Sequence, residues 1–187
     1  MMMLSPLQWM FYLAALLAIV ASLKVISGKN SVHSLLYLVV SLLAVAVCFY
    51  LMGAPFAAGL EVIVYAGAIL VLFVFAIMMF GLGQDETLHA PQVSSLTIWL
   101  GPSCIAIILL AQLVFVIDSG ELQEQLTANV ISAKQVGTLL YGPYLLAVEI
   151  ASFLLLAGLI AGYHFAKPDG QDEHLRLHQP SNEKGEP

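Results

Sequence analysis

Residues 60–79 read LEVIVYAGAILVLFVFAIMM, in which Glu61 is the one charged side chain among apolar and small residues. An α-helix rises 1.5 Å per residue, so roughly 20 such residues cross the ~30 Å hydrocarbon core of a bilayer. The apolar run that contains this stretch covers residues 56–82. The sequence therefore predicts a transmembrane helix here.

Four further apolar runs of similar length surround it, and turn-forming residues such as Gly53 and Pro55 separate the runs. Backbone groups in lipid must be paired within their own segment, and a membrane β-barrel would show short alternating segments instead. We therefore expect an all-α integral membrane protein whose residues 1–166 form a domain of five transmembrane helices. The other four predicted spans are 6–26, 32–52, 94–117 and 144–165.

Charge separates the two ends of these helices. Five crossings place the termini on opposite sides, and one side carries five of the six cations while the other side carries Lys134 alone. The positive-inside rule then predicts an N-terminus outside and a C-terminus in the cytoplasm. Residues 167–187 are rich in Asp, Glu, Gln, Pro and Gly, which is typical of a disordered tail.

Composition excludes several classes of function. The chain has 187 residues, of which 60% are hydrophobic, and its net charge of −6 comes from acids in loops and in the tail, which argues against nucleic-acid binding. Cys48 and Cys104 stand alone in apolar runs, so we expect both to be buried and neither to bind metal. No nucleotide-binding or iron-sulfur motif is present. Any redox chemistry is therefore expected to belong to partner subunits.

Glu61 and Glu149 are carboxylates inside otherwise apolar helices. An ionised carboxylate at the bilayer centre costs about 3 kcal/mol, so such residues usually face protein or water and line ion or proton paths. Removal from water also favours the neutral form, which suits a group that takes up and releases protons. The alternative is that either residue lies close enough to a helix end to reach interfacial water.

Tyr65 follows Glu61 by four residues, so in an α-helix the phenol and the carboxylate would share one face and could share a water molecule. Ordinary aromatic packing is the alternative for Tyr65. The next residues, Ala66-Gly67-Ala68, are small and permit either close helix packing or a local π-bulge. The residues alone do not choose between these.

Two stretches resemble a known family. The segment Asn30–Met79, with NSVHSLLYLVVSLL and the LEVIVYAGAILVLFVFAIMM block, is similar to the subunit J (chain 6) family of bacterial NADH-quinone oxidoreductase, respiratory complex I. So is Ile131–His164, ISAKQVGTLLYGPYLLAVEIASFLLLAGLIAGYH. In that family the third helix carries a π-bulge whose rearrangement is thought to make or break a water path. The resemblance thus implies a bulge or gate at Tyr65, Ala66 and Gly67.

What the resemblance implies for function is a membrane-arm subunit of a proton-translocating NADH:quinone oxidoreductase, not catalytic alone, in the bacterial inner membrane. Glu61, Tyr65 and Glu149 would belong to its proton path. This chain would hold no cofactor, whereas FMN, iron-sulfur clusters, NADH and quinone would bind to partner subunits. The partners would include the quinone-site and antiporter-like subunits. A scaffold role in the same membrane arm and an independent ion transporter are the alternatives.

Overall fold

The computed structural model describes residues 6–28, 31–79, 95–119 and 130–166, and every regular element in these ranges is helical. Five of the helices are long and apolar enough to cross a membrane, which confirms the predicted fold class. The chain divides into two compact units, Met1–Gln135 and Val136–Pro187. The grouping of residues 1–166 into one domain stays a prediction, as does the side on which each terminus lies.

The bounds of the helices lie close to the predicted spans. The first unit contains α1 (Pro6–Ser27), α2 (Ser31–Leu51), α3 (Pro55–Leu60), the π-helix η1 (Glu61–Ile69), α4 (Leu70–Met79) and α5 (Ser95–Asp118). Helices α3, η1 and α4 are continuous and together make the third span. The predicted residues 80–82 of that span, the acidic loop after it and the tail after Ala166 lie outside the described residues.

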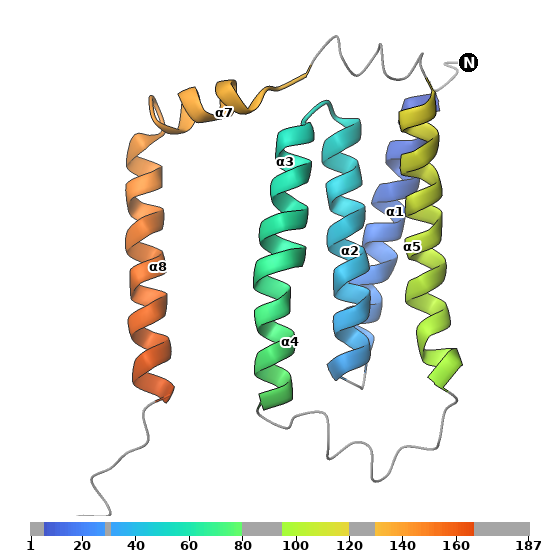
Figure 1. Cartoon of the computed structure of the whole chain (residues 1–187), viewed down its shortest axis with the longest axis horizontal. Coiled ribbons are helices and arrows are strands. Elements are labelled where there is room, and N and C mark those ends of the chain that lie inside the picture. Colours follow the sequence, from blue (N-terminus) through green and yellow to red (C-terminus); the bar gives the residue numbers. More distant parts are fainter. Residues whose placement is uncertain (1–5, 29–30, 80–94, 120–129, 167–187) are drawn as a thin grey trace, which may run out of the picture. The chain divides into compact units, whose positions relative to one another are not determined.

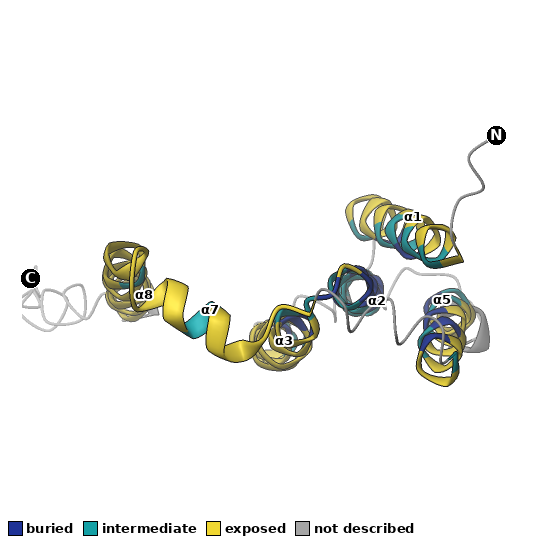
Figure 2. Ribbon diagram, turned by 90° about the horizontal axis from the view of Figure 1, so that it is seen from above, coloured by how far each residue is buried: buried dark blue, intermediate teal, exposed yellow. Residues whose placement is uncertain are grey.

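Helix α2 stands at the centre of the first unit, where it contacts α1, α5 and all three parts of the third span (Figures 1 and 2). Because α2 has neighbours on several sides, it carries more buried side chains than any other helix described, whereas α1 and the third span each bury only one stripe. The core joins α1, α2 and α5 through Ala14, Val40, Ala44, Val47, Cys48, Leu51, Leu109 and Val116.

Polar side chains add hydrogen bonds between these helices. The hydroxyls of Ser22 on α1 and Ser41 on α2 lie 2.8 Å apart, and the Ser41 hydroxyl also lies 3.2 Å from the carbonyl oxygen of Ala18. The side-chain amide of Gln112 on α5 donates to the carbonyl oxygen of Met10 on α1 at 2.5 Å. Such bonds matter in lipid because water is not there to replace them, and each contributes about 0.6 kcal/mol on average in a measured membrane protein.

A tight turn joins α2 to the third span. Gly53 adopts φ 78°, a left-handed conformation in which a side chain would clash with the backbone. The Gly53 and Ala54 amides donate to the carbonyl oxygens of Tyr50 and Phe49, and Pro55 then begins α3. Proline suits this first helical position because its missing N–H would have no partner there.

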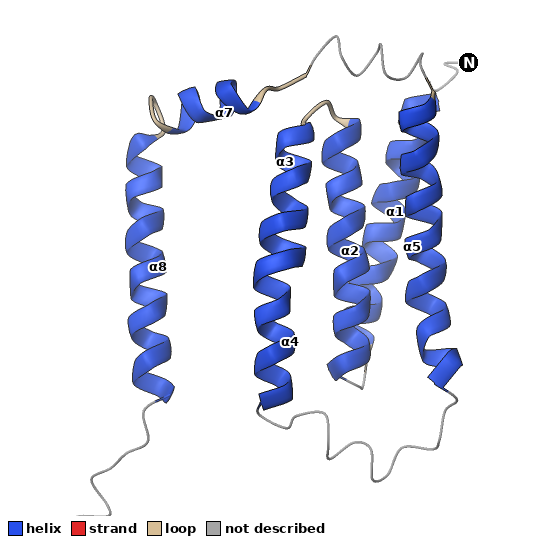
Figure 3. Cartoon of the chain, in the orientation of Figure 1, coloured by secondary structure: helices blue, strands red, loops and turns tan. Residues whose placement is uncertain are grey.

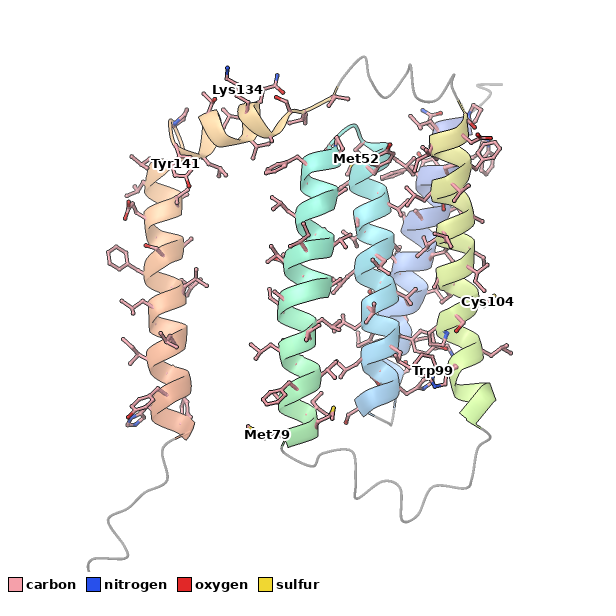
Figure 4. The ribbon with its side chains drawn as sticks, in the orientation of Figure 1. Met52, Met79, Trp99, Cys104, Lys134 and Tyr141 are labelled. Atoms are coloured by element: carbon pink, nitrogen blue, oxygen red, sulfur yellow. The ribbon has the colours of Figure 1, made fainter. Side chains whose placement is uncertain are left out.

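The two cysteines differ in their environments. Cys48 is buried in α2, as expected, but Cys104 is exposed on α5, where Figure 4 labels it. The expectation of a buried Cys104 is therefore wrong for this chain. Among the described residues of the first unit, the main helix contacts of α5 are with α2 and α1.

The second unit is built around α8 (Leu145–Ala166), the fifth membrane span. A short helix, α7 (Ala133–Leu140), precedes it within the connection between the fourth and fifth predicted spans (Figure 3). The signal for α7 was a capping box. The Gln135 amide donates to Ser132 Oγ at 3.3 Å, and the Ser132 amide donates to Gln135 Oε1 at 2.9 Å.

Candidate functional site: the π-helix of the third span

The third span changes from α- to π-helix at Glu61 and returns to α-helix at Leu70. At its end the Leu70 amide donates to the carbonyl oxygen of Tyr65, five residues earlier, which is the π-helical hydrogen-bond pattern. Tyr65, Ala66 and Gly67, the residues to which the resemblance assigned a bulge, all lie inside this segment. Their role as a gate stays a prediction.

Burial along the span shows the effect of the wider helix. Ala58, Glu61 and Leu70 are buried, and Ala66 is the one residue between Glu61 and Leu70 that is partly buried. The inward stripe therefore steps by five residues from Glu61 to Ala66 and by four from Ala66 to Leu70. An α-helix would step by three or four throughout. The π-helix thus accommodates one extra residue and keeps Glu61 and Leu70 on the same buried side.

Glu61 lies at the first position of the π-helix and is only 9% exposed. The elements around it, α3 and η1, pack against α2, so the carboxylate is on the protein-facing side of its span rather than on the lipid-facing side. Its backbone amide donates to the carbonyl oxygens of Ala57 and Ala58, where the α-helical ladder ends. A buried carboxyl therefore stands next to a non-standard helical segment.

Tyr65 does not share this environment. Its side chain is 52% exposed, so the structure does not bring the phenol and the Glu61 carboxylate together on one buried face. The physical reason is the π-helical register, in which the position that faces α2 moves from the fourth residue after Glu61 to the fifth, Ala66. Sequence reasoning assumed an α-helix and therefore placed Tyr65 on the same helix face as Glu61.

Gly67 has a steric role in the π-helix. A Cβ atom at this position would lie 3.2 Å from the carbonyl oxygen of Val62, closer than most such contacts. The backbone at Val62 would have to shift to accept a side chain. Glycine at position 67 therefore avoids a crowded contact with the Val62 carbonyl within the π-helix.

Glu149, the other predicted carboxylate, lies on α8 in the second unit and is exposed there. Its carbonyl oxygen accepts a hydrogen bond of 2.7 Å from the Ser152 hydroxyl. Glu149 is therefore exposed within its own unit, whereas Glu61 is buried. Among the described residues, no group of three His, Cys, Asp or Glu side chains is arranged to hold a metal ion.

An apolar groove borders the π-helix. It has a volume of about 600 Å³ and lies between α2, the third span and α5. Gly59 and Val62 line it from the third span, Ala46 and Val47 from α2, and Leu109 from α5. The apolar groove and the Glu61 carboxyl group are thus adjacent to the same helical turn.

These features define a multi-pass helical membrane protein with a buried carboxyl beside a π-helix in its third span. Residues 21–165 match the model of the NADH-ubiquinone/plastoquinone oxidoreductase chain 6 family, and the chain belongs to this family. The resemblance noted from the sequence is therefore confirmed.

Named relatives cover most of the chain. NADH-quinone oxidoreductase subunit J of Pseudomonas aeruginosa is 47% identical over 165 residues, which is 88% of this chain and 99% of the relative. The subunit J of Escherichia coli K12 is 46% identical over 169 residues, 90% of this chain and 91% of the relative. A Buchnera aphidicola subunit J is 43% identical over 161 residues, 86% of this chain and 98% of the relative.

Proposed function

We propose that this chain is a membrane-arm subunit of a proton-translocating NADH:quinone oxidoreductase in the bacterial inner membrane, where it contributes a gated water path for protons. The family and the names of its relatives support the assignment to such a complex. The observation that carries the gating is the π-helix that begins at the buried Glu61.

The π-helix supplies two discrete arrangements of the same residues. In the π form Ala66 is the inward residue after Glu61 and Tyr65 points away from the buried side. If the segment becomes α-helical, the inward position moves to the fourth residue after Glu61, which is Tyr65. A bulky phenol then replaces a methyl group beside the carboxyl.

This exchange gates water by volume and by polarity. In the π form the small Ala66 leaves room next to Glu61, and in the α form the Tyr65 ring fills that room while its hydroxyl becomes a hydrogen-bond partner for the carboxyl. Glu61 takes up or releases a proton according to which environment surrounds it. Redox reactions in the partner subunits drive the exchange, and FMN, iron-sulfur clusters, NADH and quinone bind there.

The test measures NADH-driven proton pumping and NADH:quinone activity in the same membranes, with Glu61→Gln, Tyr65→Phe and Gly67→Val in the chromosomal copy. Glu61→Gln keeps the shape but cannot release a proton, so we expect fewer protons pumped per NADH at normal complex content. Glu149→Gln is measured in parallel and shows whether the second acid also belongs to the path.

Native gels establish that each variant complex is assembled. Lower proton yield in assembled Glu61→Gln and Gly67→Val complexes supports the gated path. Normal yield in all three variants would leave this chain as a scaffold of the membrane arm. Activity or transport by the purified chain without partner subunits would instead favour an independent transporter.

A further inference from the structure

Helix α7 is amphipathic over its whole length. At about 100° per residue, Val136, Leu139 and Leu140 fall on one side of the helix, and Lys134 and Thr138 fall on the other. Leu139 is 51% exposed and Leu140 is 42% exposed, so the described residues leave most of the apolar side uncovered.

The C-terminal end of α7 is tied to the end of a membrane span. The turn Tyr141–Tyr144 leads directly into α8, and the Tyr144 amide donates to the carbonyl oxygen of Leu139 at 3.1 Å. Helix α7 runs across the axis of α8 rather than along it (Figure 1). The last turn of α7 therefore lies within a few residues of the level at which α8 enters the membrane. Tyr141 and Tyr144, both exposed, are residues typical of that level.

The N-terminal end of α7 is tied to a second span end. The Ile131 amide donates to the carbonyl oxygen of Gly53 at 2.9 Å, and Gly53 forms the turn between α2 and α3. The capping box at Ser132 and Gln135 then starts the helix one residue later. Because two spans, the third span and α5, lie between the α2–α3 turn and the start of α8, these two points lie at the same membrane face.

We propose that α7 lies in the membrane–water interface at this face, with Val136, Leu139 and Leu140 inserted against lipid acyl chains. Both ends of α7 are held at the level of span ends, so its exposed leucines are at the depth where acyl chains begin. Lys134 on the opposite side stays in water, and an apolar face below a charged face is what holds interfacial helices in place. The helix anchors the α2–α3 turn, and with it the end of the third span that leads to Glu61.

The experiment places a photoreactive benzophenone amino acid at Leu139, at Val136 or, as the control on the polar face, at Lys134. Each variant is expressed in native membranes with all partner subunits, irradiated, and the chain is then analysed by gel and by mass spectrometry. We expect lipid adducts at positions 139 and 136 that are several-fold more abundant than at position 134.

Two results would overturn the proposal. A cross-link from position 139 or 136 mainly to another protein would show that a partner subunit covers the apolar face. Equally low lipid adducts at all three positions would show that the helix lies in water. Two positions on the apolar face are used so that one variant that fails to assemble does not remove the test.

Discussion

Two polar side chains of the first unit, those of Gln112 and Glu61, are buried with different energetic consequences. Gln112 is 7% exposed and uses its amide to hold α1 and α5 together, whereas Glu61 is 9% exposed beside a helical segment of unusual geometry. A neutral amide that donates one good hydrogen bond stabilises a helix pair. A carboxyl group in the same kind of place costs free energy unless it is protonated or hydrated, and it is therefore the residue of the two that suits proton transfer.

Gly101 shows a steric requirement at the same scale. A Cβ atom on Gly101 of α5 would collide with the hydroxyl of Tyr37, which is buried on α2. Overpacking of this kind typically costs about 1–3 kcal/mol. We predict that Gly101→Ala lowers the amount and the thermal stability of the assembled complex, measured by native gels after graded heating.

The second substitution that relieves the collision is Tyr37→Phe, because it removes the hydroxyl. The double variant Gly101→Ala/Tyr37→Phe should regain part of the lost stability. Gly158→Ala is the matched control, since none of the described residues lies within 4 Å of a Cβ at that position. If Gly101→Ala is as stable as the control, the close approach of α2 and α5 does not limit stability.

At the scale of elements, the π-helix determines which residues of the third span face α2. The residues before and after it, Ala58 and Leu70, both lie on the buried side because the segment contains one extra residue. A regular α-helix over the same sequence would rotate α4 relative to α3 by about 100°. The non-standard segment thus preserves packing on both sides of it.

This reasoning predicts the result of a one-residue deletion. Without Val64, Ala66 comes four positions after Glu61, so the span can be a continuous α-helix and keep Ala58, Glu61 and Leu70 on the buried side. We expect the complex to assemble near the wild-type level but to lose proton pumping, because one of the two proposed arrangements no longer exists. Native gels and pumping assays on the same membranes measure both quantities.

The control is deletion of Leu72, which lies in the regular helix α4. This deletion rotates the rest of α4 by about 100° and should lower assembly. Normal pumping in the Val64 deletion would show that the π-helix is not needed for function. If both deletions lower assembly equally, the idea that the π-helix contains one extra residue is wrong.

At the scale of the whole molecule, the distribution of charge predicts the orientation of the chain. With Lys134 the only cation on its side, the termini should be oriented with the N-terminus outside and the C-terminus in the cytoplasm. A green fluorescent protein fused after Pro187 should fluoresce, and alkaline phosphatase inserted between residues 120 and 129 should be active. If the fluorescent protein fused after Pro187 does not fluoresce, and alkaline phosphatase fused at the same position is active, the predicted orientation is wrong.

The five spans were predictable because length and apolarity are properties of each segment taken alone. The π-helix could not be predicted from the residues alone, since Ala66-Gly67-Ala68 is compatible with both close packing and a bulge. The short helix α7 was missed because its apolar residues are too few to stand out in a polar connection. The capping residues Ser132 and Gln135 were the signal that could have revealed it.

The amino-acid sequence alone was enough to predict a membrane protein, its number of spans and its family, because lipid requires every span to be long and apolar. That Glu61 is buried while Tyr65 is exposed, and that Cys104 is exposed, became visible only in the packed structure. Those outcomes depend on helical register and on which neighbours pack where. A single extra residue in a turn changes the register, and periodicity calculated for an α-helix cannot detect it.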